Sequence, residues 1–168
     1  MTSGSNGNLW FGKFRAIVTE NEDPEGIGRI KAKVQQFDDK DQDLIWALPA
    51  LPFAGPQVGL YLIPPKKAWV WIEYEGGDRQ RPIWTGCFWT NLPTVDPTRL
   101  PGAKPHIKVL KTKNCTITIN DDNGAVSVET KDGRLSITSQ AVELTNGTAT
   151  VKLSGKTVSL NGNALEVT

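Results

Sequence analysis

The sequence of 168 residues predicts an all-β protein made of two modules. Stretches in which apolar and polar residues alternate recur along the chain, whereas no segment shows a convincing apolar period of 3.6 residues. The composition also changes sharply near residue 90, because all six Trp, five Phe and two Tyr lie between Trp10 and Trp89. The last of the eleven prolines is Pro105, and Thr, Ser, Asn and Gly are abundant after it. We interpret this shift as the boundary between two modules.

The first module begins with a predicted β-hairpin. Apolar and polar residues alternate over residues 13–19 and again over residues 29–34, and the sequence Asp-Pro-Glu-Gly at 23–26 lies between them. Proline presets φ and glycine accepts a positive φ, so this tetrapeptide is typical of a turn. We therefore expect two half-buried strands joined by this turn.

Further strands are predicted towards the end of this module. Residues 68–74 are apolar on both faces, so we expect this strand to be covered on both sides. A Gly-Gly-Asp turn at 76–78 then leads into residues 82–89. Four or five short strands in about 80 residues suit a small closed barrel of the OB type, which we assign to residues 10–89, after a short flexible tail at 1–9.

A proline-rich linker is predicted at residues 90–106. Four of these residues are proline. Because proline has no N–H group to donate to a β-ladder, it favours an extended connection between two modules.

The second module, at residues 107–168, is a repeat of short strands. Pairs of apolar residues at i and i+2 recur every seven to nine residues, with Asn, Asp and Gly between the pairs. Regular spacing of short strands and turns is typical of a β-solenoid or β-helix. The residues expected to form its core are Ile117, Ile119, Val126, Val128, Leu135, Ile137, Val142, Leu144, Val151, Leu153, Val158, Leu160, Leu165 and Val167.

A repeat of this length cannot enclose a core by itself. Each repeat offers about two apolar side chains on one face of a short strand, which is too little apolar area to form an interior within one chain. Three chains wound together, each contributing one face, would enclose such a core and pair the open strand edges. We therefore predict an intertwined triple-stranded β-helix in a homotrimer. The alternative is a meander of short hairpins that forms a sandwich.

Residues 12–34, 46–55 and 68–78 resemble the OB domain of contractile-tail spikes. The most specific parts are the sequences Gly-Arg-Ile-Lys-Ala-Lys-Val and Trp-Ala-Leu-Pro-Ala-Leu-Pro. This family includes phage baseplate assembly protein V, the VgrG proteins of type VI secretion and the spikes of extracellular contractile injection systems. The resemblance covers roughly residues 10–89, and beyond Ile107 it is one of pattern.

The resemblance implies a structural protein and not an enzyme. It implies a trimeric membrane-piercing needle that sits on a baseplate hub at the end of the tail tube and contacts the target membrane transiently. No lysozyme-like domain separates the two modules, so digestion of a cell wall is not implied. A blunt β-helix end exposes strand edges, so we expect a separate PAAR-like tip protein to dock at Leu165 and Val167. The residues expected to serve barrel packing or contacts to the hub and the other chains are Trp46, Trp69, Trp71, Trp84 and Trp89.

The residue inventory argues against several other functions. The chain has 19 Lys+Arg and 18 Asp+Glu, so no basic excess favours nucleic acid or an anionic membrane. Its two cysteines, Cys87 and Cys115, and its single histidine, His106, are too few for a tetrahedral zinc site in one chain. We expect both cysteines to be small buried apolar residues, and we expect no catalytic residue, metal or cofactor.

One alternative function stays open, which is a stand-alone OB-fold module that binds oligosaccharide or single-stranded nucleic acid, with the repeat as a passive stalk. Its best candidate patch is Lys66 and Lys67 beside Trp69 and Trp71, because OB barrels bind single strands on aromatic platforms.

The N-terminal residues lack the basic region and apolar core of a signal peptide. We therefore expect assembly in the bacterial cytoplasm, as a component of a phage tail-like particle or virion.

Overall fold

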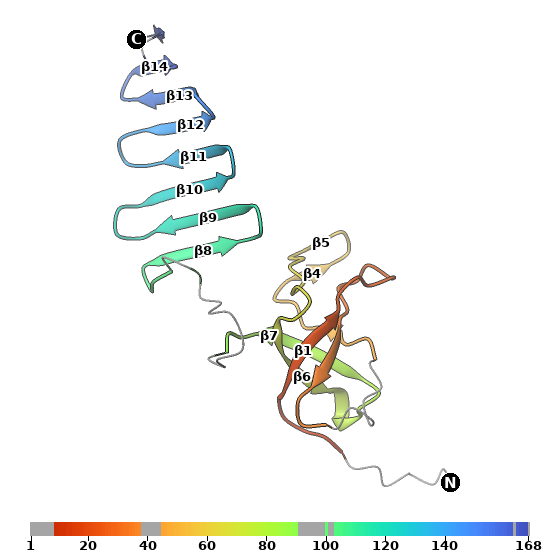
Figure 1. Cartoon of the computed structure of the whole chain (residues 1–168). Coiled ribbons are helices and arrows are strands. Elements are labelled where there is room, and N and C mark those ends of the chain that lie inside the picture. The colour runs from red at the N-terminus through yellow and green to blue at the C-terminus, as the bar shows by residue number, and fades with distance from the viewer. Residues whose placement is uncertain (1–8, 38–44, 91–99, 101–102, 163, 168) are drawn as a thin grey trace, which may run out of the picture. The chain divides into compact units, whose positions relative to one another are not determined.

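The computed structural model is all-β, as predicted, and divides into two compact units, residues 1–97 and 98–168 (Figure 1). Each unit has its own main sheet. The predicted tail at 1–9 and the predicted linker at 90–106 lie largely outside the described residues. The residues that the structure describes are 9–37, 45–90, 100, 103–162 and 164–167.

The first unit is a five-stranded barrel. Its strands hydrogen-bond in the order β2-β1-β6-β7-β3, and β3 runs parallel to β7 while the other pairs are antiparallel. A bridge between Ile30 and Ala47, with N···O distances of 2.8 and 3.2 Å, joins the segments that precede β2 and β3 and closes the barrel. The predicted OB-type barrel is therefore confirmed. The strands are β1 (Phe14–Glu20), β2 (Lys31–Val34), β3 (Leu48–Pro49), β6 (Trp69–Tyr74) and β7 (Pro82–Cys87).

Alternation of side chains along the strands builds the barrel core. In the predicted hairpin, Ala16 lies opposite Val34 and Val18 lies opposite Ala32. Because successive side chains of a strand point to opposite faces, apolar residues two apart reach the same interior. The buried hydrophobic residues of the core are Ala16, Val18, Ile30, Val34, Ala47, Val70, Ile72 and Trp84.

Two smaller elements extend from the barrel. Strands β4 (Ala54–Gly55) and β5 (Val58–Gly59) pair in a hairpin between β3 and β6, which projects from the barrel in Figure 1. The 3-10 helix η2 (Glu75–Gly77) makes the predicted turn between β6 and β7. Glycine is required at position 77, because φ is +80° and a Cβ atom there would lie 3.1 Å from the backbone nitrogen of Trp10.

A buried carboxylate organises the loop between β1 and β2. The Asp23 carboxylate accepts hydrogen bonds from the backbone N–H groups of Glu25, Ile27 and Arg29 at 3.0–3.1 Å. It also accepts from the guanidinium of Arg29, at 2.7 Å, and its side chain is only 1% exposed. The Arg29 guanidinium holds the pKa of Asp23 well below its usual range. This loop is therefore fixed by its ion pair as well as by its predicted turn residues.

A second carboxylate at the end of β1 makes barrel stability depend on pH. The Glu20 carboxylate accepts hydrogen bonds from the Lys66 ammonium and from the backbone N–H groups of Glu22 and Asn21, and the Lys66 contact is the largest cause that lowers its pKa from 4.5 to about 2. The folded state thus binds this proton more weakly than the unfolded state does. Its stabilising contribution is complete above about pH 4.5 and is lost as the pH falls towards 2.

We expect Glu20→Gln to flatten the dependence of barrel stability on pH between about 4.5 and 2. Urea unfolding of the full chain at several pH values, followed by tryptophan fluorescence, measures this because every tryptophan lies in the first unit. Lys66→Met should give a similar flattening, since it removes the main partner of the carboxylate. Wild-type and variant profiles that stay parallel would contradict the assignment.

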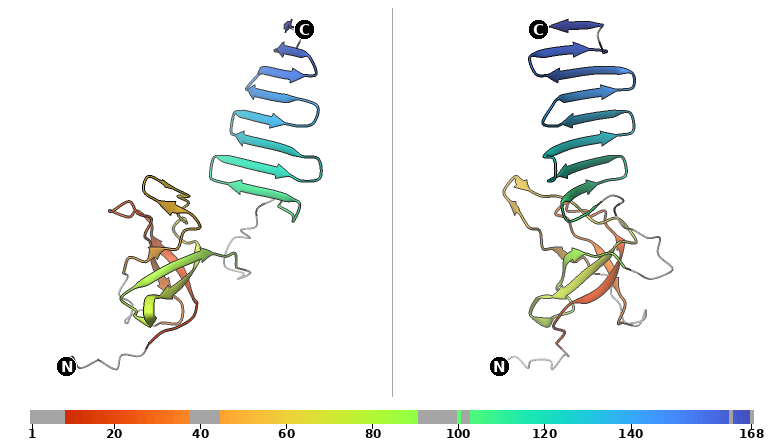
Figure 2. Two further views of the ribbon diagram at one scale, coloured as in Figure 1. Left: turned by 180° about the vertical axis from the view of Figure 1, so that it is seen from behind. Right: turned by 90° about the vertical axis from the view of Figure 1, so that its left-hand side faces the viewer.

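The second unit is an antiparallel meander, in which each strand pairs only with its neighbours in the sequence (Figure 2). The repeat of seven to nine residues is thus one strand plus one turn. Within one chain the described residues of this unit form a single sheet, without the second layer of a sandwich. The intertwined β-helix concerns three chains and stays a prediction. The strands are β8 (Ile107–Lys111), β9 (Cys115–Asn120), β10 (Ala125–Thr130), β11 (Gly133–Ile137), β12 (Val142–Asn146), β13 (Ala149–Ser154), β14 (Thr157–Leu160) and β15 (Leu165–Val167).

Threonine hydroxyls clamp three turns of the meander. In each, the threonine Oγ1 atom accepts a hydrogen bond from the N–H group three residues later, at 3.1 Å. The same hydroxyl donates to the carbonyl of that residue, at 3.1–3.3 Å. Both backbone groups at the start of the next strand are therefore satisfied by one side chain. The pairs are Thr112 with Cys115, Thr130 with Gly133 and Thr138 with Ala141.

We expect Thr130→Val to destabilise the meander by about 1–2 kcal/mol per chain, because it removes two hydrogen bonds while keeping the β-branched shape. The thermal unfolding midpoint, followed by circular dichroism, measures the effect. Thr118→Val is the matched control, because Thr118 lies in the middle of β9 opposite Ser127 and clamps no turn. Equal midpoints for the two variants would show that the hydroxyl clamp contributes nothing.

Candidate trimer interface

The register of the meander brings the predicted core residues to one face of the sheet. Residues directly opposite each other in an antiparallel ladder lie on the same face, and so do residues two apart in a strand. The pairs therefore line up in two rows that cross the strands. One row is Leu110, Ile117, Val128, Leu135, Leu144, Val151, Leu160 and Leu165. The other row is Ile119, Val126, Ile137, Val142, Leu153 and Val158, and the backbone of Val167 pairs with Val158.

This apolar face is open in the single chain. Leu144 is 54% exposed, Leu153 is 47% exposed and Ile119 is 45% exposed. None of the described residues of the second unit is fully buried, and the buried core residues all lie in the barrel. A sheet with one extended apolar face and no core of its own requires a cover.

From β9 to β14, the opposite face of the sheet is polar. Its central row runs from β9 to β14 and contains hydroxyl groups and one pair of opposite charges, Glu143 opposite Lys152. The other members of this row are Thr118, Ser127, Ser136 and Ser159. The two faces therefore suit different surroundings. The apolar face suits an apolar partner, and the polar face suits water.

Strand β8 departs from the pattern of the other strands. Its alternation is shifted, so that Lys108 lies opposite Ile119 and Leu110 lies opposite Ile117, on the apolar face. Lys108 forms an ion pair with Asp121. The sequence analysis missed Leu110, because Ile107 and Val109 form the more conspicuous i and i+2 pair of this strand. The shift places a charged pair where the apolar rows begin.

The residues predicted to dock a tip protein lie at the other edge of the sheet. Leu165 belongs to β15, the outermost strand in the order that ends β13-β14-β15, and it is 54% exposed. Val167 belongs to the same strand and pairs through its backbone with Val158. One edge of β15 carries no strand of the same chain among the described residues. The contact of these residues with a tip protein stays a prediction.

The five predicted tryptophans occupy different environments in the barrel. Trp84 lies in the core, 4% exposed, and its Nε1–H group donates to the carbonyl of Gly28 at 3.0 Å. Trp46 is half-buried below the side chains of Arg29 and Lys31, whose charged groups lie 5.5 and 5.1 Å from its ring centroid. Trp84 thus serves barrel packing.

Trp69 and Trp71 form an outer aromatic face together with Phe88, and Trp89 follows Phe88 in the chain. The ring centroid of Phe88 lies 4.4 Å from that of Trp71 and 5.8 Å from that of Trp69. The Arg15 guanidinium lies 5.7 Å from the Trp71 and Phe88 centroids. Trp89 is 64% exposed. Sequence reasoning expected cover on both sides of this strand, and the outer side is covered in part by Phe88 and Arg15.

The patch proposed for single-stranded nucleic acid is compromised in this arrangement. The Lys66 ammonium pairs with the Glu20 carboxylate at 2.9 Å, so its charge is offset locally. Trp71 already stacks on Phe88 at an interplanar angle of 29°. A base would have to displace that contact to stack on the same face. The geometry therefore does not favour a binding platform here.

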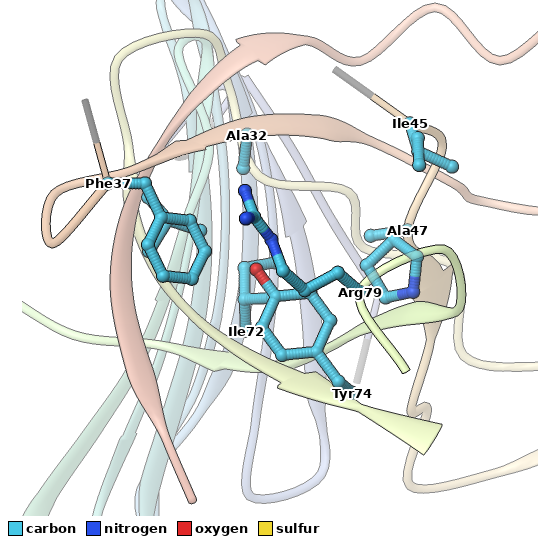
Figure 3. A pocket seen from close by; sticks show the side chains of 9 residues that line it. Ala32, Phe37, Ile45, Ala47, Ile72, Tyr74 and Arg79 are labelled. Carbon is cyan, nitrogen blue, oxygen red and sulfur yellow. The ribbon is translucent and has the colours of Figure 1, made fainter. Parts of the chain in front are cut away.

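A small cavity at one end of the barrel is equally unsuited to a sugar. It holds about 30 Å³, which is roughly the space of one water molecule. Figure 3 shows Phe37, Tyr74 and Arg79 around it, and the Arg79 guanidinium lies 4.2 Å from the Phe37 ring centroid. Most of its lining residues belong to the barrel core or pack against it.

The residues considered for reactive or metal chemistry are dispersed. Cys87 is exposed and Cys115 is half-buried, so the expectation that both are buried was wrong for Cys87, which lies at the end of β7. The Nε2 atom of His106 lies 3.4 Å from the Oδ2 atom of Asp122. In the part of the chain that the structure describes, no group of three His, Cys, Asp or Glu side chains could hold a metal ion. No helix among those residues has the length and apolar character to cross a bilayer.

Two family models match the chain. The type VI secretion system/phage-baseplate injector OB domain matches residues 14–89, which contain the barrel. The phage baseplate V C-terminal trimerisation domain matches residues 107–166, which contain the one-faced meander. No curated protein matches the chain.

The match to the trimerisation domain indicates what covers the open apolar face, because it supports self-association as a homotrimer. The two matches together span most of the sequence, and the chain belongs to the family of phage baseplate V spike proteins.

Proposed function

We propose that three copies of this chain form the central spike of a contractile injection machine, with the meander as a membrane-piercing needle and the barrel as a collar on the baseplate hub. The observation that carries the proposal is the open apolar face of the meander, built from residues of a trimerisation domain. Three such sheets facing one axis bury their apolar rows and turn their polar faces to water.

The surface of the meander suits a mechanical role. Residues 107–168 contain no aromatic residue, and the outer row consists of short hydroxyl side chains and one charge pair. Receptor-binding and sugar-binding surfaces are usually rich in aromatic side chains, which supply contact area. A smooth polar exterior with a dry interior is what a needle needs to pass through an envelope.

The proposal includes partners at both ends and a place of assembly. The hub at the end of the tail tube receives the barrel, and a PAAR-like tip protein caps the free edges at β15. The particle assembles in the bacterial cytoplasm, and the needle contacts the target membrane only when the machine contracts. No catalytic step is part of this role, and no cofactor is required.

Light scattering coupled to size exclusion tests the proposal on the full chain, alone and mixed with a purified PAAR-like protein. The chain alone should have three times the mass of one chain. The mixture should contain a species with the mass of that trimer plus one tip protein. A compact monomer would overturn the spike. A stable trimer that binds no such tip protein would retain the spike and remove the cap.

A further inference from the structure

The hairpin β4–β5 forms an exposed apolar surface that the fold of its own chain leaves uncovered. No Lys, Arg, Asp or Glu occurs between Asp43 and Lys66. We define the apolar hairpin as residues 53–62. Contiguous exposed surface of this kind is rare on soluble proteins unless a partner covers it. Its exposed residues are Phe53 at 59%, Val58 at 55%, Leu60 at 44%, Tyr61 at 59% and Leu62 at 48%.

The apolar hairpin is held in a defined position. The N–H group of Leu60 donates to the carbonyl of Phe53 at 2.9 Å, next to the β4–β5 pairs. At its base, the Asn21 side-chain amide donates to the carbonyl of Pro64 at 3.0 Å. The ring of Tyr61 lies 3.5 Å from the position that a Cβ atom of Gly28 would take. The hairpin therefore presents its apolar side chains in a fixed geometry, which favours docking over adaptable contacts.

The same barrel carries a second surface of matching character, the outer aromatic face. Its residues Trp69, Trp71 and Phe88 are half-buried, and Trp89, the next residue after Phe88, is 64% exposed. The hairpin and the aromatic face both stay open within one chain, so neither covers the other. Two different apolar surfaces on one molecule allow a head-to-tail contact between copies, and such a contact closes into a ring under three-fold symmetry.

The occupant that the chain itself supplies is a neighbouring copy. The meander joins three chains, and residues 90–106 tie each barrel to it. A segment of 17 residues spans at most roughly 60 Å. The three barrels are thus held at an effective concentration in the millimolar range. We propose that in the trimer the apolar hairpin of one protomer packs on the outer aromatic face of its neighbour, so that three identical contacts form a closed collar. This inference rests on the proposed trimer.

Chemical cross-linking of the full chain tests the contact. In a chain whose other cysteine, Cys115, is replaced by serine, Val58→Cys places a thiol on the apolar hairpin, and the natural Cys87, which is exposed, adjoins Phe88 of the aromatic face. We expect a short bismaleimide to convert the V58C protein to a covalent trimer on a denaturing gel, since each chain is linked to both neighbours. Adding Cys87→Ser should abolish the cross-link. Adding Leu60→Glu should reduce it at least tenfold, because a charge enters the apolar contact, while light scattering still reports a trimer.

The outcomes separate this inference from the proposed function. A trimer in which V58C gives no cross-linked species overturns the collar contact and leaves the spike intact. Covalent dimers that persist without Cys87 indicate a hairpin-to-hairpin contact and also overturn it. If light scattering reports a monomer, both the spike and the collar are wrong.

Discussion

Leu144→Asp is expected to leave the chain monomeric. In the isolated chain Leu144 is 54% exposed, so an aspartate there stays hydrated and the chain tolerates it. In the trimer the same position faces the shared interior, between Leu135 and Val151 in the apolar row. Burying three carboxylates without partners costs several kcal/mol each, which exceeds what a trimer interface can absorb. Light scattering on the purified full chain measures the shift in mass.

The neighbouring residue on the same strand supplies the control. Thr145 lies on the polar face, opposite Arg134, so Thr145→Asp places its charge in water beside a cation. This variant should remain a trimer with unchanged thermal stability. A Leu144→Asp protein that also stays a stable trimer would show that the apolar face is not the interface.

Trp84→Ala is expected to destabilise the barrel by about 3–5 kcal/mol through the cavity it leaves. Trp84 is 4% exposed in the core, and its Nε1–H group satisfies the carbonyl of Gly28. Truncation therefore also leaves a buried acceptor without its partner, which adds to the loss. Urea unfolding followed by the fluorescence of the remaining tryptophans measures the effect.

Two comparisons make this result specific. Trp84→Phe keeps most of the ring volume but loses the donor, so it should cost only about 1–2 kcal/mol. The mass of the Trp84→Ala protein in native buffer should still be that of a trimer, because the apolar rows belong to the other unit. Loss of the trimer in Trp84→Ala would show that the barrel, and not the meander, drives assembly.

Strands and turns were predictable from the sequence because their signals are local. The alternation over Ala16 and Val18 and the turn at Asp23 specify the first hairpin without knowledge of the rest of the chain. Barrel closure was not predictable in detail. The bridge from Ile30 to Ala47 joins the alternating segment 29–34 to a residue next to β3, which has two residues and is too short to show alternation.

The candidate interface was predictable in its residues but not in its geometry. Apolar pairs at i and i+2 identify one face of each strand, whatever the direction of its neighbours. Whether neighbours run parallel or antiparallel depends on the turns, and the clamp of Thr130 on Gly133 is a contact that alternation does not reveal. The place of Arg15 over Trp71 depends on the pairing of β1 with β6, so sequence spacing could not indicate it.

The pairing of each strand with its sequence neighbours makes the meander a structure of adjustable length. Two consecutive strands form a unit that returns the chain to its starting direction and keeps its apolar residues on the same face. Deleting or duplicating such a hairpin changes the sheet by two strand spacings, or about 10 Å, and leaves the remaining register intact. The number of hairpins thus acts as a molecular ruler, by which the reach of the protein can be altered in single genetic steps without any change to the barrel.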